Sequence, residues 1–527
     1  MLTKSVQMLK KIRVILAAAC FMAVTLLFLD FTGALHLWLG WMAKIQFLPA
    51  VLSLNLAVII ALILLTLIFG RIYCSVICPL GVFQDIFAHW GAKSRKKPYK
   101  FSKELKWLRY GVFILFVIAV IAGIHAIVAL LAPYSAYGRI AQNLFQPVYI
   151  LFNNILAWLA ERAGSYAFYS REPWLRSLPT LLVATASVVI LVILALKGGR
   201  TYCNTICPVG TALSFFSRFS LFKPVINVEK CKNCKLCERN CKASCIDISR
   251  HYIDYSRCVD CFNCIGACKF DALHYTIRKN SGKRKPKALA KGNFEKGAQA
   301  ERDIKASAPS AANQTGAVNI SRRAFLIGAS LVTGSVVAHA AEEIKNDGGL
   351  APIKPKQAPV RKTKITPPGS VSLKNMYEHC TACQLCVAAC PNNVLRPSTG
   401  LDNFMQPESS YERGYCRPEC TKCSEVCPAG AILKIDKAEK SSIQIGHAVW
   451  LRELCLPVKD GVSCGNCGRH CPVGAIRMVA LEPGKSGLRV PAVNEERCIG
   501  CGACENLCPS RPLSAIYVEG HQVHRKI

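Results

Sequence analysis

Long uncharged stretches dominate the first 200 residues and predict helices that cross a membrane. Charged residues are absent from 26, 29 and 20 consecutive positions, at 45–70, 110–138 and 177–196. An earlier apolar stretch, 14–41, is interrupted only by Asp30. A helix needs about 20 apolar residues to cross the hydrocarbon layer of a bilayer. The pattern therefore predicts four spans, near 13–35, 49–70, 108–132 and 177–197.

Lysines and arginines between these stretches predict how the chain is oriented. The segment 71–109 carries nine basic and two acidic residues, whereas 132–176 carries only four basic residues. Because basic loops stay in the cytoplasm, we expect 71–109 to be cytoplasmic and 132–176 to lie outside. The stretch 140–160 is also uncharged, but its amide side chains suit an interfacial or packed helix better than a fifth crossing. The strongly basic segment 278–305 agrees, since a fifth crossing would put it outside.

A twelve-residue repeat follows the second and fourth predicted spans. Segments 70–81 and 199–210 are identical at eight of twelve positions, and both contain Cys-x3-Cys-Pro. Residues four apart share one face of a helical turn, so each copy presents a pair of thiols. Two pairs meeting across a pseudo-twofold axis would form a four-thiolate site for iron–sulfur or zinc. The alternative is two independent pairs, redox-active or structural. The four cysteines are Cys74, Cys78, Cys203 and Cys207.

Two histidines lie toward the outer ends of the first and third predicted spans. His36 and His125 are each candidates to donate a hydrogen bond to a quinone carbonyl. The alternative for each is a histidine that only packs between helices.

Residues 223–280 contain two cysteine runs with the spacing of a two-cluster ferredoxin. Three cysteines of a run hold one 4Fe–4S cube, and the fourth reaches across to the other cube. A zinc site would need four ligands in a C-x2-C…C-x2-C layout, which leaves the third and fourth cysteines of each run unexplained. Lys242 and Lys269 stand where proline usually follows the fourth cysteine, and Cys245 is an alternative to Cys241. The predicted ligand sets are Cys231, Cys234, Cys237 and Cys268 for one cube, and Cys258, Cys261, Cys264 and Cys241 for the other.

Residues 371–527 carry four more runs, each ending in Cys-Pro. The first and fourth runs have regular x2-x2-x3 spacing, and the second and third are stretched. Like spacing predicts that the first run pairs with the fourth and the second with the third. Four cubes in such a small domain must supply much of its folding energy, so we expect the metal-free domain to be unstable. The runs are Cys380, Cys383, Cys386 and Cys390; Cys416, Cys420, Cys423 and Cys427; Cys455, Cys464, Cys467 and Cys471; and Cys498, Cys501, Cys504 and Cys508.

The segment between the two cysteine-rich parts of the chain predicts a flexible linker followed by an export signal. Residues 281–319 are basic and rich in Ala, Gly and Ser, which indicates a flexible linker. Paired Arg322 and Arg323 then precede a moderately apolar stretch, so 320–342 matches a twin-arginine leader or anchor helix. The alternative, a basic flank of a weak fifth span, gives the same topology. Residues 343–370 would form a tether, placing 371–527 in the periplasm.

Composition narrows the class of protein. The chain has 527 residues, 52% of them apolar, 30 cysteines and a formal net charge of +34. This combination excludes an ordinary soluble globule and a disordered chain. Its basic residues flank apolar spans or lie in the linker, which favours a membrane surface over nucleic acid. There is no C-x-x-C-H haem motif, Walker loop or G-x-G-x-x-G, so any terminal reaction must belong to a partner.

These motifs together resemble two known families joined in one chain. Residues 1–280 resemble the NapH-type quinol-oxidising membrane ferredoxins, through the spans, the Cys-x3-Cys-Pro repeats and the two-cluster tail. Residues 320–527 resemble the NapG/MauM-type periplasmic polyferredoxins, through the leader and the four runs. The resemblance implies electron transfer from membrane quinol, through six 4Fe–4S clusters, towards a periplasmic reductase of the nitrate reductase type or a cytochrome acceptor. A redox-sensing or maturation factor for a metalloreductase is the alternative.

The predicted architecture is mixed, in the inner membrane, and built from six segments. A four-span α-helical membrane domain, 1–222, precedes a cytoplasmic two-cluster α+β ferredoxin module, 223–280. The linker 281–319, the leader or anchor helix 320–342 and the tether 343–370 lead to a four-cluster α+β polyferredoxin domain, 371–527.

Overall fold

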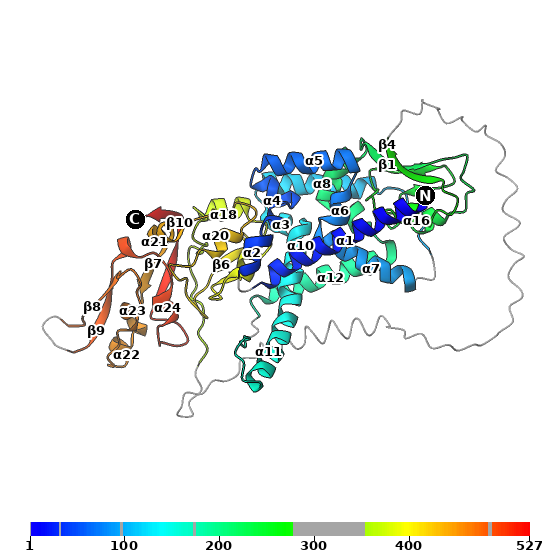
Figure 1. The fold of residues 1–527 in the computed structure, drawn as a ribbon. Coiled ribbons are helices and arrows are strands. Elements are labelled where there is room, and N and C mark those ends of the chain that lie inside the picture. The colour runs from blue at the N-terminus through cyan, green and yellow to red at the C-terminus, as the bar shows by residue number, and fades with distance from the viewer. Residues whose placement is uncertain (1, 31–32, 95–97, 172–174, 278–353, 483–486) are drawn as a thin grey trace, which may run out of the picture.

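The computed structural model describes residues 2–30, 33–94, 98–171, 175–277, 354–482 and 487–527. The predicted linker, the leader helix with its twin arginines and the first part of the tether lie outside the described residues. In the described chain, a helical region stands between two cysteine-rich regions (Figure 1). Residues 222–277 pack at one end of it and residues 354–527 at the other.

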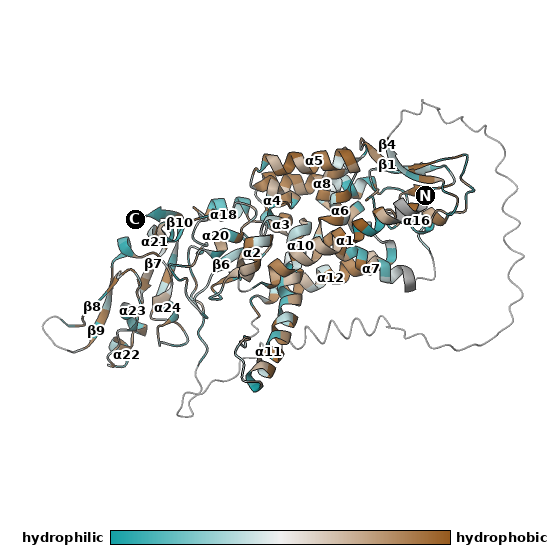
Figure 2. Cartoon of the chain, in the orientation of Figure 1, coloured by the Kyte–Doolittle hydropathy of each residue, from teal (hydrophilic) through white to brown (hydrophobic). Residues whose placement is uncertain are grey.

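Two helices are long and apolar enough to cross a membrane, α1 (Leu2–Leu29), over Met8–Leu29, and α12 (Leu178–Gly198). The apolar helix α5 (Leu56–Phe69) and helix α8 (Lys106–Ile121) are shorter. Figure 2 shows that the residues of α5, α8 and α12 are mostly hydrophobic. The described residues therefore show two candidate membrane helices, not the four that the hydropathy pattern predicts.

Local caps explain where the predicted spans break. The first was predicted to reach residue 35, but α1 ends at Leu29 because the Asp30 carboxylate accepts the backbone N–H groups of Gly33 (2.9 Å) and Leu35 (2.8 Å). The second divides into α4 (Phe47–Leu52) and α5, whose N-terminus is capped by the Asn55 side chain. The third divides at Gly123, in a left-handed conformation, into α8 and α9 (His125–Leu131).

Short helices complete the helical region and carry the repeats. Each repeat forms a short helix and then a longer one that begins at the proline of Cys-Pro. The uncharged stretch 140–160 forms a π-helical turn, Ala141–Phe145, followed by α11 (Gln146–Arg162), which projects from the bundle (Figure 1). The remaining helices are α2 (Ala34–Leu39), α3 (Trp41–Lys44), α6 (Ile72–Val76), α7 (Pro79–Ser94), α10 (Pro133–Ile140), α13 (Thr201–Thr205) and α14 (Pro208–Ser217).

The first cysteine-rich region is a small α+β unit. Its β1 (Phe222–Ile226) pairs with β4 (Leu273–Ile277) in an antiparallel ladder. Between them lie α15 (Leu236–Arg239), β2 (Ile246–Asp247), β3 (Tyr252–Ile253) and α16 (Asn263–Ala267). A separate core of cysteines and aliphatic side chains fills the unit, so it folds around its thiols.

The second cysteine-rich region is also α+β, with antiparallel two-stranded ladders. The longest joins β7 (Ile443–Trp450) to β10 (Ile516–Lys526). Two further ladders are β5 (Leu395–Pro397) with β6 (Pro407–Ser409), and β8 (Ile476–Ala480) with β9 (Arg489–Val493). The helices are α18 (Leu373–His379), α19 (Leu385–Ala389), α20 (Lys422–Val426), α21 (Lys437–Ser442), α22 (Leu456–Lys459), α23 (Asn466–Arg469) and α24 (Ala503–Asn506), with 3-10 turns at Arg452–Leu454 and Glu495–Arg497.

The second cysteine-rich region is docked directly on the helical region. The Asn143 amide donates to Gln384 Oε1 (3.2 Å), and Arg176 donates to the carbonyl of Val387 (2.9 Å). Leu385 and Val387 are buried in the same core as Tyr134 and Tyr137. The part of this region around α19 therefore shares one core with the helical region, and its later part, with β7 and β10, has a core of its own.

Candidate metal centres

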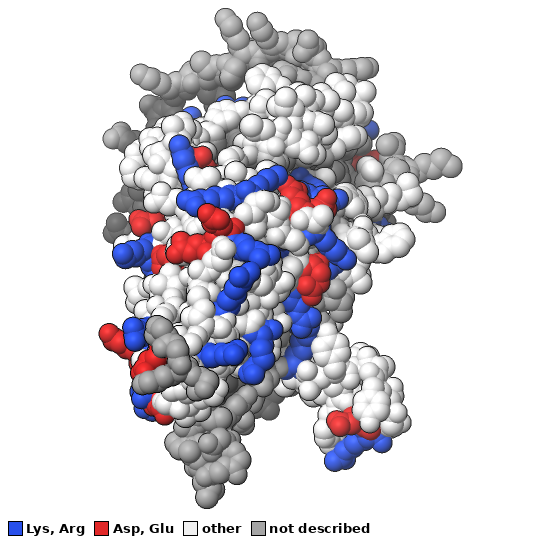
Figure 3. All heavy atoms as spheres, turned by 90° about the vertical axis from the view of Figure 1, so that its left-hand side faces the viewer, with Lys and Arg blue, Asp and Glu red and all other residues white. Residues whose placement is uncertain are grey.

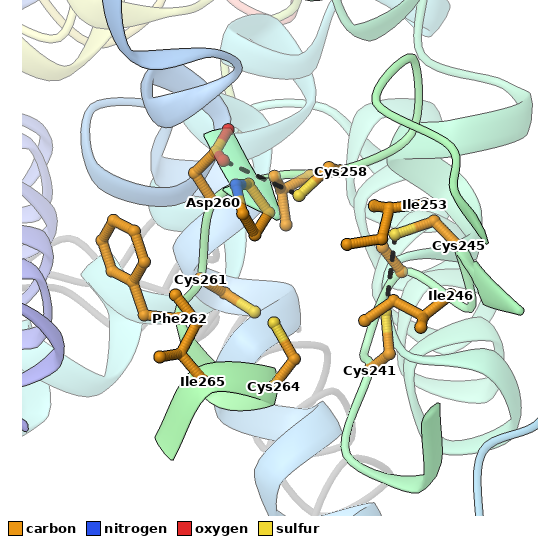
Figure 4. Close-up of a pocket in the computed structure, with 13 residues that line it drawn as sticks. Cys241, Cys245, Ile246, Ile253, Cys258, Asp260, Cys261, Phe262, Cys264 and Ile265 are labelled. Carbon is orange, nitrogen blue, oxygen red and sulfur yellow. Dashed lines mark hydrogen bonds between the residues drawn. The ribbon is translucent and has the colours of Figure 1, made fainter. Parts of the chain in front are cut away.

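The two runs of residues 222–277 surround two separate cavities. Ile226, Phe270 and Leu273 line the first, together with Cys231, Cys234, Cys237 and Cys268. The second is lined by Cys241, Cys245, Cys258, Cys261 and Cys264 (Figure 4). The first cavity thus receives three thiols from the first run and one from the second, and the second cavity receives three thiols from the second run together with Cys241 and Cys245. Cys241 and Cys245 lie 3.5 Å apart at their sulfurs, so the structure keeps both as candidates for the fourth position.

The regular runs share one backbone conformation. On both sides of the second cysteine the chain is left-handed, at Asn233 and Lys235, at Asp260 and Phe262, at Ala382 and Gln384, and at Gly500 and Gly502. Six of these eight residues are not glycine, and a left-handed conformation is rare and energetically costly for any other residue. The four runs differ in sequence at these positions but share the same strained conformation. This indicates that the loop is shaped to hold its thiols around the group that they enclose.

The structure corrects the predicted pairing in the second cysteine-rich region. The first run pairs with the second, because Cys427 lies beside Cys380, Cys383 and Cys386, and Cys390 lies beside Cys416 and Cys423. The third run pairs with the fourth in the same way: Cys508 lies near Cys455 and Cys467, and Cys471 lies near Cys498 and Cys501. The spacing of the cysteines did not predict which runs pair, because the pairing depends on which short helices pack against each other. Helix α19 packs on α20, and α23 on α24.

Burial controls the chemistry of these thiols. It raises the pKa of Cys383 and Cys467 to about 11 and that of Cys501 to about 12. A hydrogen bond from Cys245 lowers the pKa of Cys241 to about 7. Because metal ligands must be thiolates, metal binding at most of these sites has to displace protons at neutral pH. Among the described residues, no three Cys, His, Asp or Glu side chains converge closely enough for a single ion. We call each set of four cysteines, three from one run and one from its partner run, a nest.

The repeat cysteines also come together. Cys74, Cys78, Cys203 and Cys207 are each about 95% buried in one core. The two copies pack so closely that a Cβ on Gly81 would lie 2.8 Å from Arg200 Nη1, and one on Gly210 would lie 2.7 Å from Arg71 Nη2. The structure therefore brings the two cysteine pairs together in one core.

Sequence reasoning missed the charged residues around this site. Arg71 and Arg200 are fully buried, and Asp85 accepts from Arg200 Nε (2.8 Å) and pairs with Arg13 (3.1 Å) and Lys242 (3.4 Å). The signal was available, since Gly-Arg is among the identical positions of the two copies.

The two candidate histidines lie apart from the repeat cysteines, where the second cysteine-rich region docks. His36 Nδ1 lies 3.3 Å from Asp30 Oδ2, near Lys422 and Glu425. Its Nε2 is buried without a hydrogen-bond partner among the described residues. His125 faces a cleft of about 510 Å³ between the start of α9 and the second cysteine-rich region, lined also by Tyr377 and Glu378.

Comparisons with known proteins agree with these centres. A 4Fe–4S binding domain model matches residues 53–98 and 180–227, and a 4Fe–4S dicluster domain model matches 379–443 and 462–511. The ferredoxin-type protein NapF of Escherichia coli K12 is 32% identical over 161 residues, covering 30% of this chain and 87% of NapF. The chain belongs to the NapF/MauM family of ferredoxin-type proteins.

Further relatives of this family support the same conclusion. The methylamine utilization ferredoxin-type protein MauM of Methylobacillus flagellatus is 31% identical over 166 residues, 30% of this chain and 70% of MauM. The ferredoxin-type protein NapG of Escherichia coli K12 is 29% identical over 185 residues, 31% of this chain and 77% of NapG. No solved structure matches. The chain is an iron–sulfur protein of electron transfer.

Proposed function

We propose that this chain holds six 4Fe–4S clusters, oxidises membrane quinol and passes the electrons through its clusters to a periplasmic reductase of the nitrate reductase type. In this proposal a NapH-type part, 1–280, is fused to a NapG/MauM-type part, 320–527. The observation that carries it is the continuous core in which cysteines of both ferredoxin regions are buried with the helices between them. Bound 4Fe–4S clusters each accept and release one electron.

The cysteine nests define an order for these clusters. From the first ferredoxin region outward, the next set after the helices is Cys380, Cys383, Cys386 and Cys427, because these thiols belong to the shared core. Cys416 donates its backbone N–H to the Cys501 carbonyl (2.9 Å), which brings the two halves of the second region together. The set Cys390, Cys416, Cys420 and Cys423 then leads to Cys471, Cys498, Cys501 and Cys504, and finally to Cys455, Cys464, Cys467 and Cys508.

The proposal includes four crossings of the inner membrane. Helices α1 and α12 are two of them, and the broken pairs α4–α5 and α8–α9 each form another. The outward side chains Leu56, Ile60 and Leu64 of α5 and Ile114, Ile118 of α8 are exposed in the chain and would contact lipid. The first ferredoxin region, after the fourth crossing, is then cytoplasmic, and export through the predicted leader or anchor segment 320–342 makes the second region periplasmic.

A reporter fused to the C-terminus tests this topology. We expect a reporter that works only outside the cytoplasm to be active, and to become silent when Arg322 and Arg323 are both replaced by Lys. Activity of a cytoplasm-only reporter at the same position would contradict the proposed arrangement.

The cleft beside His125 is the proposed quinol site. It opens next to exposed Ile121 and Ile124, from which a lipid-soluble molecule can enter. Each quinol gives up two electrons and two protons. His125 and Glu378 line the cleft as proton acceptors, and Glu378 lies two residues before Cys380. The cleft therefore lies next to acceptors for both products of quinol oxidation: His125 and Glu378 accept the protons, and the cluster at Cys380 accepts the electrons.

Quinol-dependent reduction of the clusters tests the function. Anaerobic protein in lipid nanodiscs should contain about 24 Fe per chain in the ferredoxin nests, and added quinol should bleach their absorbance. His125→Gln should slow bleaching at least tenfold, while His89→Gln, on an exposed helical surface, should not. Intact clusters that quinol cannot reduce in the unsubstituted protein would overturn the proposal.

A further inference from the structure

The arginine of each repeat reaches across the four-cysteine site and donates a hydrogen bond to the other repeat. Arg71 Nη2 donates to the carbonyl of Cys203 (3.1 Å) and lies 3.8 Å from the sulfur of Cys74. Arg200 Nη1 donates to the carbonyl of Cys74 (2.6 Å) and lies 3.8 Å from the sulfur of Cys203. Each arginine therefore holds the first cysteine of both copies. This is a twofold arrangement that a pair of unrelated thiol sites would not need.

These guanidinium groups also retain unused donors. Arg71 Nε and Arg200 Nη2 are buried with no hydrogen-bond partner among the described residues. Burying a charge without full pairing is expensive. An anionic group held by four thiolates between the two arginines would offset that cost.

Neither copy of the repeat has enough thiols to hold a cluster alone. The 4Fe–4S binding model matches each copy separately, yet the matched segments contain only Cys74 and Cys78 in one and Cys203 and Cys207 in the other. An iron–sulfur cluster takes four protein ligands. Two from each copy complete one set.

We infer that Cys74, Cys78, Cys203 and Cys207 together bind one iron–sulfur cluster, and that this seventh centre carries electrons between the cytoplasmic and periplasmic clusters. The inference rests on the proposed function for its direction and its topology. Each transfer moves one electron, oxidises the donor cluster, reduces the acceptor cluster and requires no proton.

Packed side chains connect this centre to the nests on both sides. Tyr73 lies beside Cys74 and Cys78, and it is also close to Tyr134. Tyr134 in turn lies beside Cys383 and Cys427 of the nearest periplasmic nest.

On the other side, Asp85 joins Arg200 (2.8 Å) to Lys242 (3.4 Å). Lys242 and Asp85 both lie near Cys261 of the nearest cytoplasmic nest. The four-cysteine site is therefore the point that both nests approach within one core.

Metal analysis of single and double variants tests whether the centre is shared. We compare iron, zinc and acid-labile sulfide, with EPR of the reduced protein, in Cys74→Ser, Cys203→Ser and the double variant. The matched control is Cys20→Ser, a cysteine of α1 outside the site. Each single variant should lose the same EPR signal and the same amount of iron, and the double variant should lose no more. Unchanged signals of the six ferredoxin clusters show that the variants fold.

Several outcomes would overturn the shared centre. Additive losses in the double variant would mean two separate sites. Zinc in place of iron would exclude electron transfer, because zinc has no redox chemistry. Iron content in these variants equal to that of the unsubstituted chain and of Cys20→Ser would mean that these thiols hold no cluster. If Cys74→Ser does not fold, Cys207→Ala tests the same prediction from the other copy.

A quinone-free assay tests the relay separately from quinol oxidation. The protein is placed in vesicles without quinone, with its first ferredoxin region outward, and ferricyanide is trapped inside. Photoreduced flavodoxin, a protein that cannot cross the bilayer, is added outside. Ferricyanide should be bleached with the unsubstituted chain and with Cys20→Ser, and at least tenfold more slowly with Cys74→Ser or Cys203→Ser.

The two assays separate failure of the relay from failure of the proposed function. Equal bleaching in all variants would overturn the relay while leaving quinol oxidation at the His125 cleft intact. Loss of quinol-dependent reduction with normal flavodoxin-dependent bleaching would overturn the proposed donor and support the relay.

Discussion

At the scale of single residues, two glycines fix how the repeats meet. Gly81 and Gly210 occupy equivalent positions, and a Cβ on each would lie within 3 Å of the arginine of the other copy, Arg200 for Gly81 and Arg71 for Gly210. We predict that Gly81→Ala or Gly210→Ala destabilises the helical region by about 1–3 kcal/mol, the usual cost of overpacking. Thermal unfolding in detergent measures it. Gly111→Ala is the control, because nothing lies within 4 Å of the added Cβ. Equal melting temperatures for all three variants would contradict the close approach.

Residue types alone predicted the thiols but not their surroundings. Cysteine spacing named the nests of the first ferredoxin region, because three ligands in a tight loop are a local requirement. Arg71 and Arg200, which hydrogen-bond between the two repeats, were missed because a charged residue at the boundary of a span looks like an ordinary membrane-interface residue. Only the packed core shows that Arg71 and Arg200 are fully buried.

At the scale of elements, one contact joins the two halves of the second cysteine-rich region. Tyr411 donates its hydroxyl to the Gly500 carbonyl (2.7 Å), and a Cβ on Gly502 would lie 2.2 Å from the Tyr411 ring. Gly502 is also left-handed. We predict that Gly502→Ala weakens the pairing and slows electron transfer between the two pairs of nests, whereas Gly465→Ala, with open space at its Cβ, does not. Stopped-flow reduction of the clusters in both variants decides this.

Hydropathy predicted where the elements begin better than how they continue. The spans near 49–70 and 108–132 read as uninterrupted apolar stretches, yet Asn55 caps one helix and Gly123 ends another. Caps and left-handed turns are single-residue events that a window average does not register. The pairing of cysteine runs was wrong for a similar reason, because contacts between α19 and α20 are not encoded in spacing.

At the scale of the whole molecule, the metal is expected to hold the cysteine-rich regions together. Their cores consist largely of cysteines and the aliphatic side chains around them. We predict that iron removal by a chelator under reducing conditions unfolds both regions while the helical region keeps its secondary structure. Far-UV circular dichroism and limited proteolysis measure the loss. Protease-resistant, metal-free ferredoxin regions would contradict the prediction.

The last nest in the proposed order lies at the far end of the molecule, and the surface around it is basic. Figure 3 shows the face of this end, where lysines and arginines outnumber acidic side chains. Arg452, Lys459, Arg469 and Arg477 are exposed there, on the elements that carry or follow Cys455, Cys467 and Cys471. An acidic redox partner would be steered to this surface, and its association rate would fall with added salt.

Charge reversal at this surface tests where electrons leave. Lys459→Glu combined with Arg469→Glu should reduce the rate of electron transfer to an acidic acceptor protein by about tenfold or more at low ionic strength, and the difference should shrink as salt is added. Arg250→Glu is the control, since its side chain is 82% exposed on the opposite ferredoxin region. Quinol-dependent reduction of the clusters nearest the His125 cleft should be the same in both variants, because neither change touches that cleft. A salt-independent rate, or an equal loss in the control, would place the exit elsewhere on the chain.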